Sequence, residues 1–252
     1  MSLQENDAVY RSVAEGFADL APTYDARMAG TPTLLLESTA VLTALPPLND
    51  AVVADFGCGT GRYTLQLVRY GARRVVGFDL IAEMLEQAKR KANRMADAEE
   101  LPLTWVEADL CERVGWEDRF FDLGVCALVL SFLPDPTGAL REMARLMKPE
   151  GQLIVSDYHP QGLLAARSAS LAAGRPDDTP YLRFTTADGE ECRIRQYPHT
   201  IADLFNAAQD AGLLLEHIAE PLADRRLSNT YYTIRDRIGQ PLALAMRFRK
   251  IG

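Results

Sequence analysis

Cysteine and histidine are scarce in this chain of 252 residues, which has four cysteines and three histidines. The cysteines form no C-x-x-C pair, so the sequence indicates neither a disulfide framework nor a zinc site. No apolar run reaches the ~18 residues that a membrane helix needs, and the first ten residues lack the apolar core of a secretory signal. We therefore expect a cytoplasmic protein that holds no metal.

Basic residues are outnumbered by acidic ones. Lys plus Arg is 27 and Asp plus Glu is 35, which gives a net charge of -8. A basic surface is what a protein needs to hold nucleic-acid phosphates, or an anionic membrane, without reading a sequence. The balance therefore predicts neither nucleic acid nor a membrane as partner, although it leaves room for a local basic patch.

From residue 51 onward, short apolar runs alternate with stretches of helical periodicity. The first five runs cover residues 51–56, 74–79, 103–109, 121–130 and 152–157. Continuous apolar runs are typical of strands that are covered on both faces. The alternation predicts parallel βαβ units in one sheet, that is, an α/β fold. Two later strands are expected near residues 213–218 and 242–248.

The segments outside this rhythm have their own patterns. Val9, Val13, Phe17 and Leu20 recur at helical spacing, which predicts a helix from Val9 onward. Residues 181–197 read as a hairpin around Asp188-Gly189, placed over the edge of the sheet where catalysis would occur. A helix with Thr200 as its N-cap follows.

The stretch from Asp55 to Gly61 reads Asp-Phe-Gly-Cys-Gly-Thr-Gly and joins an expected strand to an expected helix. Glycines permit a tight turn and a close approach of the backbone to a ligand. A plain βα turn is the alternative. Asp79 ends the second expected strand, 22 residues after Gly57. Its carboxylate suits the two hydroxyls of a ribose, or it caps the helix that starts at Ile81.

The glycine spacing is Gly-x-Gly-x-Gly, which departs from the Gly-x-Gly-x-x-Gly of dinucleotide-binding loops. The sequence here resembles the class I S-adenosylmethionine-dependent methyltransferases. Five motifs in order carry the resemblance, at residues 53–61, 76–80, 107–110, 121–123 and 146–151.

The resemblance implies a Rossmann-like, doubly wound, mostly parallel sheet of seven strands. It also implies one domain over residues 1–252 with four consecutive parts: an N-terminal helical lid (1–48), a cofactor-binding half (50–160), a substrate-side insert (160–200), and the last helix and strands (200–252).

S-adenosylmethionine is the implied cofactor, with S-adenosylhomocysteine as its product. The resemblance assigns its contacts to Gly57, Gly59 and Gly61 for the methionine part, Asp79 for the ribose, Leu80, Met84, Asp109 and Leu110 for the adenine, Ala127 and Leu128 for the sulfonium, and Asp55 for ordering the loop or reaching the amino group through water. Two of these have plain alternatives: Met84 as a core residue and Asp109 as a turn residue.

A second match lies at the N-terminus. Residues 17–25 read Phe-Ala-Asp-Leu-Ala-Pro-Thr-Tyr-Asp and resemble the entry segment of small-molecule methyltransferases, including the ubiquinone/menaquinone and malonyl-acyl-carrier enzymes. In such enzymes this segment folds over the cofactor. The resemblance makes Tyr24 a candidate for cofactor contact and catalysis. The alternative is a tyrosine that closes the N-terminal helix.

Histidines supply the other catalytic candidates. His159 follows the fifth expected strand, where a general base or a substrate-binding group would lie. The alternative is a histidine that fixes the loop before Pro160. His199 is a weaker candidate of the same kind. Arg193 and Arg195 in the hairpin would either meet an acidic substrate or carry solvated charge.

Together these features predict methyl transfer to a small molecule by in-line displacement, with O, N or C as the acceptor atom. The enzyme is expected to be a monomer or a homodimer. Two other readings stay open: an NAD(P)-dependent oxidoreductase, and a non-catalytic protein that binds S-adenosylmethionine or another nucleotide metabolite.

Overall fold

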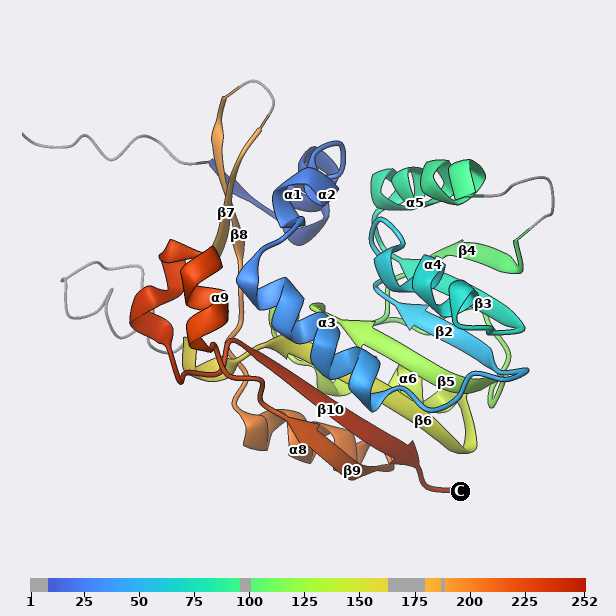
Figure 1. Ribbon diagram of the computed structural model, residues 1–252. Coiled ribbons are helices and arrows are strands. Elements are labelled where there is room, and N and C mark those ends of the chain that lie inside the picture. The colour runs from blue at the N-terminus through green and yellow to red at the C-terminus, as the bar shows by residue number, and fades with distance from the viewer. Residues whose placement is uncertain (1–8, 96–100, 163–179, 187–188) are drawn as a thin grey trace, which may run out of the picture.

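The computed structural model describes residues 9–95, 101–162, 180–186 and 189–252 (Figure 1). Its strands are β1 (Val9–Arg11), β2 (Val52–Phe56), β3 (Arg74–Asp79), β4 (Leu103–Glu107), β5 (Phe121–Ala127), β6 (Met147–Tyr158), β7 (Tyr181–Thr185), β8 (Glu191–Arg195), β9 (Leu213–Ala219) and β10 (Ala243–Lys250). Its helices are α1 (Val13–Leu20), α2 (Tyr24–Met28), α3 (Pro32–Ala44), α4 (Arg62–Arg69), α5 (Ala82–Met95), α6 (Thr137–Leu146), α8 (Ile201–Asp210) and α9 (Arg225–Thr230), with 3-10 turns η1 (Leu130–Phe132) and η2 (Tyr232–Arg237).

The main sheet has seven strands in the order β4-β3-β2-β5-β6-β10-β9. The strands from β4 to β6 pair in parallel, and β10 runs antiparallel to both β6 and β9. The predicted α/β fold with a mostly parallel seven-stranded sheet is confirmed. Parallel strands bring their carboxyl ends to one edge, and strand order reverses between β2 and β5, where such sheets bind ligands.

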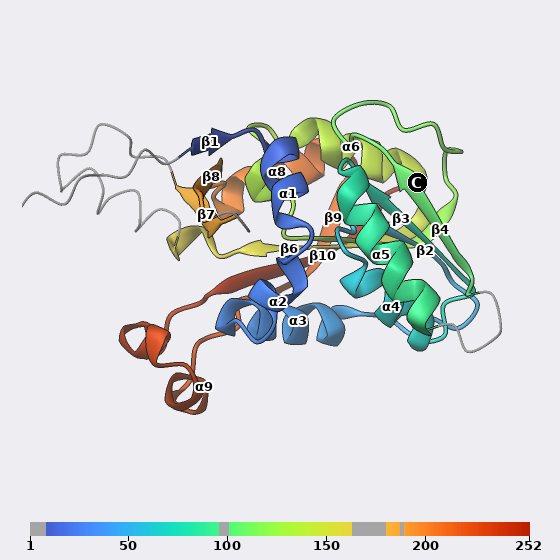
Figure 2. The same ribbon diagram turned by 90° about the horizontal axis from the view of Figure 1, so that it is seen from above.

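Helices cover both faces of this sheet, with α3, α4 and α5 on one side and α6 and α8 on the other (Figure 2). In β2, Val52 and Phe56 pack in the cluster that contains α6, while Val53 packs with α3 and α4. Every residue of β2 is buried. Cover on both faces is therefore the reason that these strands are continuously apolar.

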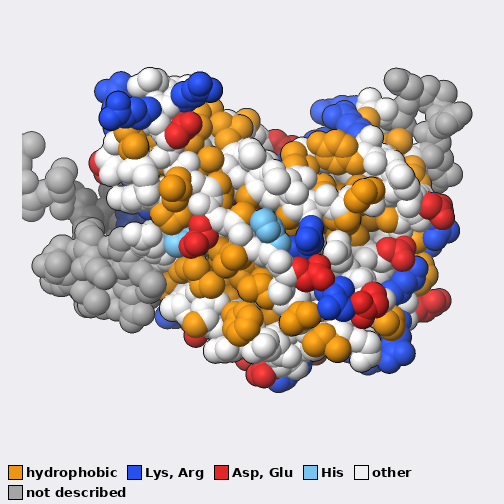
Figure 3. Space-filling view, turned by 60° about the horizontal axis from the view of Figure 1, so that its bottom comes forward, with side chains coloured by type: hydrophobic (Ala, Val, Ile, Leu, Met, Phe, Trp, Pro, Cys, Tyr) orange, Lys and Arg blue, Asp and Glu red, His pale blue; other side chains and the backbone are white. Residues whose placement is uncertain are grey.

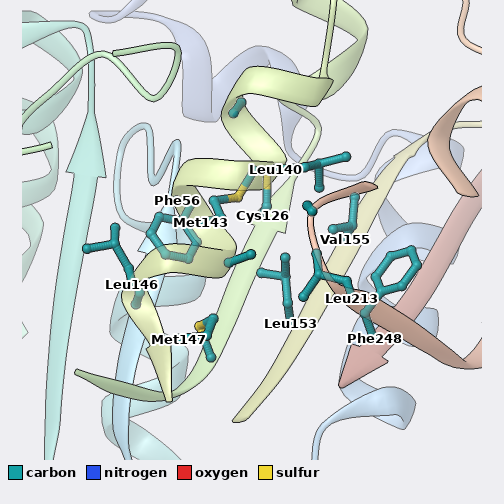
Figure 4. Close-up of a cluster of buried hydrophobic side chains, with 14 of the residues drawn as sticks. Phe56, Cys126, Leu140, Met143, Leu146, Met147, Leu153, Val155, Leu213 and Phe248 are labelled. Atoms are coloured by element: carbon teal, nitrogen blue, oxygen red, sulfur yellow. The ribbon is translucent and has the colours of Figure 1, made fainter. Parts of the chain in front are cut away.

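The larger core cluster lies between the sheet and helix α6 (Figure 4). Leu140, Met143 and Leu146 of α6 are no more than 1% exposed and pack onto Phe56 and Leu153 of the strands. Burial of a side chain of this size contributes about 1.5–3 kcal/mol, so this layer fixes the strands whose ends form the site.

The sequence-based helix from Val9 is wrong at its start, because residues 9–11 form strand β1. This strand pairs in parallel with β8, in a three-stranded sheet ordered β1-β8-β7. Helix α1 begins after Ser12, whose side chain and that of Glu15 form a capping box. Pairing with a distant strand outweighs the local helical spacing.

Most of the remaining elements agree with expectation, although β6 begins at Met147, five residues before the run expected at 152–157. The predicted hairpin exists as β7 and β8, and its turn at residues 187–188 lies outside the described residues. Thr200 is the N-cap of α8, with its hydroxyl accepting from the Asp203 amide. β5 stops at Ala127 rather than continuing to residue 130, because Leu128 turns the chain with a φ of 60°.

None of the described helices is long and apolar enough to cross a membrane. On the face drawn in Figure 3, acidic and basic side chains of the described residues lie interspersed among hydrophobic ones. The described residues on that face form no continuous basic surface of the kind that binds nucleic acid.

Candidate functional site

A pocket opens between the carboxyl ends of strands β2 to β6 and the N-terminal helices α1 and α2. It is lined by Val13, Phe17, Tyr24, Met28, Gly57, Gly59, Asp79, Leu80, Ile81, Met84, Ala108, Asp109, Leu110, Ala127, Leu128, Val129, Phe132, Leu133, Tyr158 and Leu182. Ten of the residues that the sequence proposed are among them, from four strand ends, from α2 and from α5. The pocket therefore lies where an open α/β sheet binds its ligand.

The three glycines of the loop have different reasons for being glycine, although all have positive φ values, of 69°, 53° and 80° in order. A Cβ on Gly57 would lie 2.3 Å from Val129 Cγ2, and one on Gly61 would lie 3.1 Å from both Ala88 and Trp105. A Cβ on Gly59 would meet nothing within 4 Å. Gly59 thus leaves open space inside the pocket, and Gly61, which does not line the pocket, serves helix packing.

Asp79 ends β3 and holds the loop with both carboxylate oxygens. Oδ2 accepts from the Gly59 amide at 2.7 Å, and Oδ1 accepts from the Ile81 amide at 2.9 Å. The capping interpretation is thus correct and does not exclude the other one, since a carboxylate has about four acceptor positions. Burial raises the pKa of Asp79, against the opposing effect of these amide donors.

The adenine-side candidates line the pocket next to Asp79. Met84 is buried against Ile81 and Ala21, so it is a core residue as well as a wall of the pocket. Leu80 lines the pocket and is 43% exposed. Asp109 accepts from the Cys111 amide at 2.8 Å and thus also forms the turn after β4.

Asp55 lies behind the pocket rather than in its wall. Its side chain is buried in β2 and accepts a hydrogen bond from the Thr64 hydroxyl of α4. Burial raises the pKa of Asp55 to about 6. Asp55 can therefore order the loop through α4, which is one of the two roles that the sequence suggested. The other role, reaching the amino group of the cofactor through water, stays a prediction.

The N-terminal segment is fastened to the glycine loop next to Tyr24. Asp25 Oδ1 accepts from the Thr60 hydroxyl at 2.6 Å, and Oδ2 pairs with Lys91 Nζ at 2.8 Å. Tyr24 lines the pocket with its ring 6.4 Å from that of Phe17, and burial raises the pKa of its hydroxyl. The sequence analysis identified Tyr24 but missed the contacts that the neighbouring Asp25 makes with Thr60 and Lys91.

A buried carboxylate on α3 links this helix to α4 and β6, a connection that the sequence analysis did not predict. Glu37 is fully buried and pairs with Arg62 at 3.0 Å. It also accepts from the Tyr63 hydroxyl at 2.9 Å and from the Ser156 hydroxyl at 2.5 Å. A polar residue within the apolar stretch of α3 was the available signal.

The two histidine candidates lie outside the pocket wall. His159 is 6% exposed; its Nε2 lies 2.7 Å from Glu220 Oε1, and its Nδ1 accepts from the Gln161 amide at 3.2 Å. His199 Nε2 donates to the Leu133 carbonyl at 2.8 Å. The His159 ring has no nitrogen left for a substrate, so the loop-fixing interpretation holds and the general-base role loses its basis.

Other residues complete the wall on the side away from Asp79. Phe132 of η1 lines the pocket, as do Tyr158 at the end of β6 and Leu182 of β7. Ser131 does not, and its amide donates to the buried Asp157. Among the described residues no group of three or more His, Cys, Asp or Glu side chains could hold a metal ion.

Comparison with known proteins gives consistent results for this region. A family model described as a methyltransferase domain matches residues 54–155, the segment that holds the glycine loop, Asp79, Asp109 and the end of β5. Residues 54–155 of this chain therefore match a methyltransferase domain.

Relatives of this methyltransferase domain include two with quinone-pathway names. The demethylmenaquinone methyltransferase of Deinococcus radiodurans is 29% identical over 161 residues, which are 62% of this chain and 65% of that protein. The ubiquinone biosynthesis O-methyltransferase of Neisseria meningitidis is 37% identical over 106 residues, 41% of this chain and 42% of that protein. The chain thus spans less than two thirds of the length of these relatives.

The fold also agrees with solved structures. An S-adenosylmethionine dependent methyltransferase from Mesorhizobium loti superposes with a TM-score of 0.65 at 20% identity, over 85% of this chain and 98% of that one. The likeness extends beyond the segment that the family model matches and includes the main sheet. At this identity it concerns the fold of the methyltransferase domain alone.

Proposed function

We propose that this protein transfers the methyl group of S-adenosylmethionine to a small-molecule acceptor. The observation that carries the proposal is the convergence of Gly57, Gly59 and Asp79 in one pocket at the strand-order reversal of the sheet. The space beside Gly59, where a Cβ would meet no atom, fits a bound group. The alternative of a dinucleotide oxidoreductase has no comparable support in the glycine spacing.

The residues that would hold the cofactor are those nearest the strand ends. Asp79 has acceptor positions left for ribose hydroxyls after serving two amides. Leu80 and Leu110 offer apolar contact for the adenine, and Ala127 and Leu128 lie at the end of β5. When bound, S-adenosylmethionine supplies a methyl group on a positively charged sulfur, which needs no metal to activate it.

The chain's own contribution is alignment and exclusion of water. Helices α1 and α2 close the pocket from above the strand ends, and Asp25 and Glu37 fasten this segment to the loop and sheet. Holding two reactants in line converts a bimolecular reaction into an effectively unimolecular one. The described wall offers no free histidine, so the acceptor atom and the fate of its proton depend on the acceptor itself.

Calorimetric titration of the full chain with S-adenosylhomocysteine, S-adenosylmethionine and NAD+ tests the proposal. We expect saturable binding of the first two and none of NAD+. Tight binding of NAD+ without S-adenosylhomocysteine binding would overturn the assignment. Binding without methyl transfer to any compound in a broad acceptor panel would favour a non-catalytic binder.

A further inference from the structure

The wall of the pocket has two chemically different parts. The part at the strand ends contains both of its carboxylates, Asp79 and Asp109. The other lining residues, which we call the acceptor wall, are Val13, Phe17, Tyr24, Met28, Val129, Phe132, Leu133, Tyr158 and Leu182. None of these described residues carries a charge.

We infer that the acceptor wall selects an uncharged, predominantly apolar molecule as methyl acceptor. The inference rests on the proposed function, because it assigns this wall to the acceptor and the strand ends to the cofactor. It adds a substrate class that neither the family match nor the fold specifies.

Five residues of the acceptor wall belong to one apolar cluster, namely Val13, Phe17, Tyr24, Phe132 and Leu182. Phe17 of α1 meets Phe132 edge-to-face with ring centroids 4.9 Å apart. Both pack with Leu182, Phe184 and Ile194 of the hairpin. A Cβ on Gly16 would lie only 2.4 Å from Ile194, so α1 and β8 are in very close contact. The wall is therefore a packed surface and not a loose collection of side chains.

The hairpin turns its cations away from this cluster. Side chains alternate across a strand, and the apolar face pairs Leu182 with Ile194 and continues through Phe184. Arg183 and Arg193 pair on the opposite face. The sequence left open whether the hairpin arginines meet an acidic substrate; their register places them on the face away from the pocket.

Cations elsewhere near the wall are already engaged. Arg62 interacts electrostatically with Tyr24 but forms an ion pair with the fully buried Glu37. Arg27 of α2 donates to the Thr185 carbonyl and to the Thr23 hydroxyl. An anionic acceptor in the pocket would find no described cation to neutralise it, and burial of an unpaired charge is costly.

Two tyrosines give the acceptor wall its polar groups. Tyr24 and Tyr158 interact with each other, and burial raises the pKa of both hydroxyls, so they stay protonated at neutral pH. A neutral phenol donates to an uncharged oxygen without leaving a charge behind. The polar end of the acceptor, where it has one, is expected to face these hydroxyls.

A matched pair of fluorescent probes tests the inference. N-phenyl-1-naphthylamine is neutral, and 8-anilino-1-naphthalenesulfonate has the same rings with a sulfonate. Both are titrated against the full chain saturated with S-adenosylhomocysteine, which has no sulfonium charge and so isolates the contribution of the protein. We expect the neutral probe to bind at least about tenfold more tightly, a factor that corresponds to about 1.4 kcal/mol.

Variants locate the binding. Leu182→Arg places a cation on the acceptor wall. It should weaken binding of the neutral probe by about tenfold and strengthen binding of the sulfonate probe. Arg183→Gln, the next residue and on the other face, should change neither. Leu133→Arg, on a different segment, repeats the test if Leu182→Arg does not fold.

The outcomes separate this inference from the proposed function. Equal or tighter binding of the sulfonate by the wild type, or neutral-probe binding that ignores both arginine variants, would overturn the apolar-acceptor class. Calorimetry with S-adenosylhomocysteine is measured on the same samples. If the wild type binds S-adenosylhomocysteine, the proposed function stands whatever the probes show. If the wild type does not bind S-adenosylhomocysteine, the proposed function itself is refuted.

Discussion

Asp79 shows how one side chain at the site serves both the fold and the ligand. Its two oxygens hold the amides of Gly59 and Ile81, and thereby join the glycine loop to the start of α5. Substitution therefore has to separate a loss of ligand contact from a loss of loop geometry. Asparagine keeps one acceptor oxygen and the size of the side chain, so it is the informative replacement.

We expect Asp79→Asn to weaken S-adenosylhomocysteine binding by at least ~1.5 kcal/mol, about tenfold, because hydrogen bonds to a charged acceptor contribute about 1.5–3 kcal/mol. Isothermal titration calorimetry measures it. The matched control is Glu83→Gln, which removes a carboxylate from an exposed position in the first turn of α5, the helix that follows Asp79. Unchanged affinity in Asp79→Asn would remove Asp79 from the binding site.

His159 makes the opposite prediction. Its buried ring is held at both nitrogens, so His159→Ala should lower the free energy of unfolding by about 1–3 kcal/mol and leave S-adenosylhomocysteine affinity unchanged. Chemical denaturation and calorimetry measure the two quantities. His217→Ala, at an exposed position of β9, serves as control. Loss of turnover with full stability would restore His159 as a catalytic candidate.

At the scale of elements, α2 is the part of the N-terminal segment with the most direct link to the glycine loop. The link consists of Asp25, Thr60 and Lys91, and Asp25 is half exposed. Exposed ion pairs are worth little, so the link is suited to hold α2 in place without locking it.

Asp25→Ala should weaken S-adenosylhomocysteine binding only ~2- to 5-fold, as loss of a pair worth ~0.5–1 kcal/mol predicts. Amide hydrogen exchange over residues 13–28 should become faster. Asp19→Ala removes a carboxylate from the same segment that pairs with Arg11 instead, and should not affect the loop. Equal effects of the two substitutions would show that the link to the loop has no special role.

Elements with local signals were predictable, and those set by distant contacts were not. The strands of the main sheet were predictable from the sequence, because cover on both faces makes them continuously apolar. β1 was missed, since only its pairing with β8 makes residues 9–11 a strand. The same limit applied to the site: Gly57, Gly59 and Asp79 have a recognisable order, whereas Leu182 and Tyr158 reach the pocket through tertiary packing alone.

At the scale of the whole molecule, buried carboxylates couple stability to pH. Asp157 is buried at the end of β6, where burial raises its pKa to about 6. The native state therefore keeps a proton that the unfolded chain, with an ordinary aspartate, releases near pH 4. Stability from this group is present below about pH 4 and is lost as pH rises to about 6.

Asp157→Asn should remove this dependence. Relative to the variant, the wild type is expected to lose about 2 kcal/mol of unfolding free energy between pH 4 and 6. Urea denaturation across that range measures the difference. Asp50→Asn, at an exposed position with a positive φ that asparagine tolerates, is the control. A constant difference between Asp157→Asn and the wild type would contradict the raised pKa.

The pairing of β1 with β8 has a consequence for synthesis on the ribosome. Arg11, the last residue of β1, donates a hydrogen bond to Glu190, 179 positions along the chain. Strands β2 to β6 leave the ribosome long before β8 does. The cofactor side of the pocket can therefore assemble while β1 is still without its pairing strand. The acceptor wall is therefore completed late, after the hairpin has left the exit tunnel, and a nascent chain stalled before residue 190 would hold a half-built pocket.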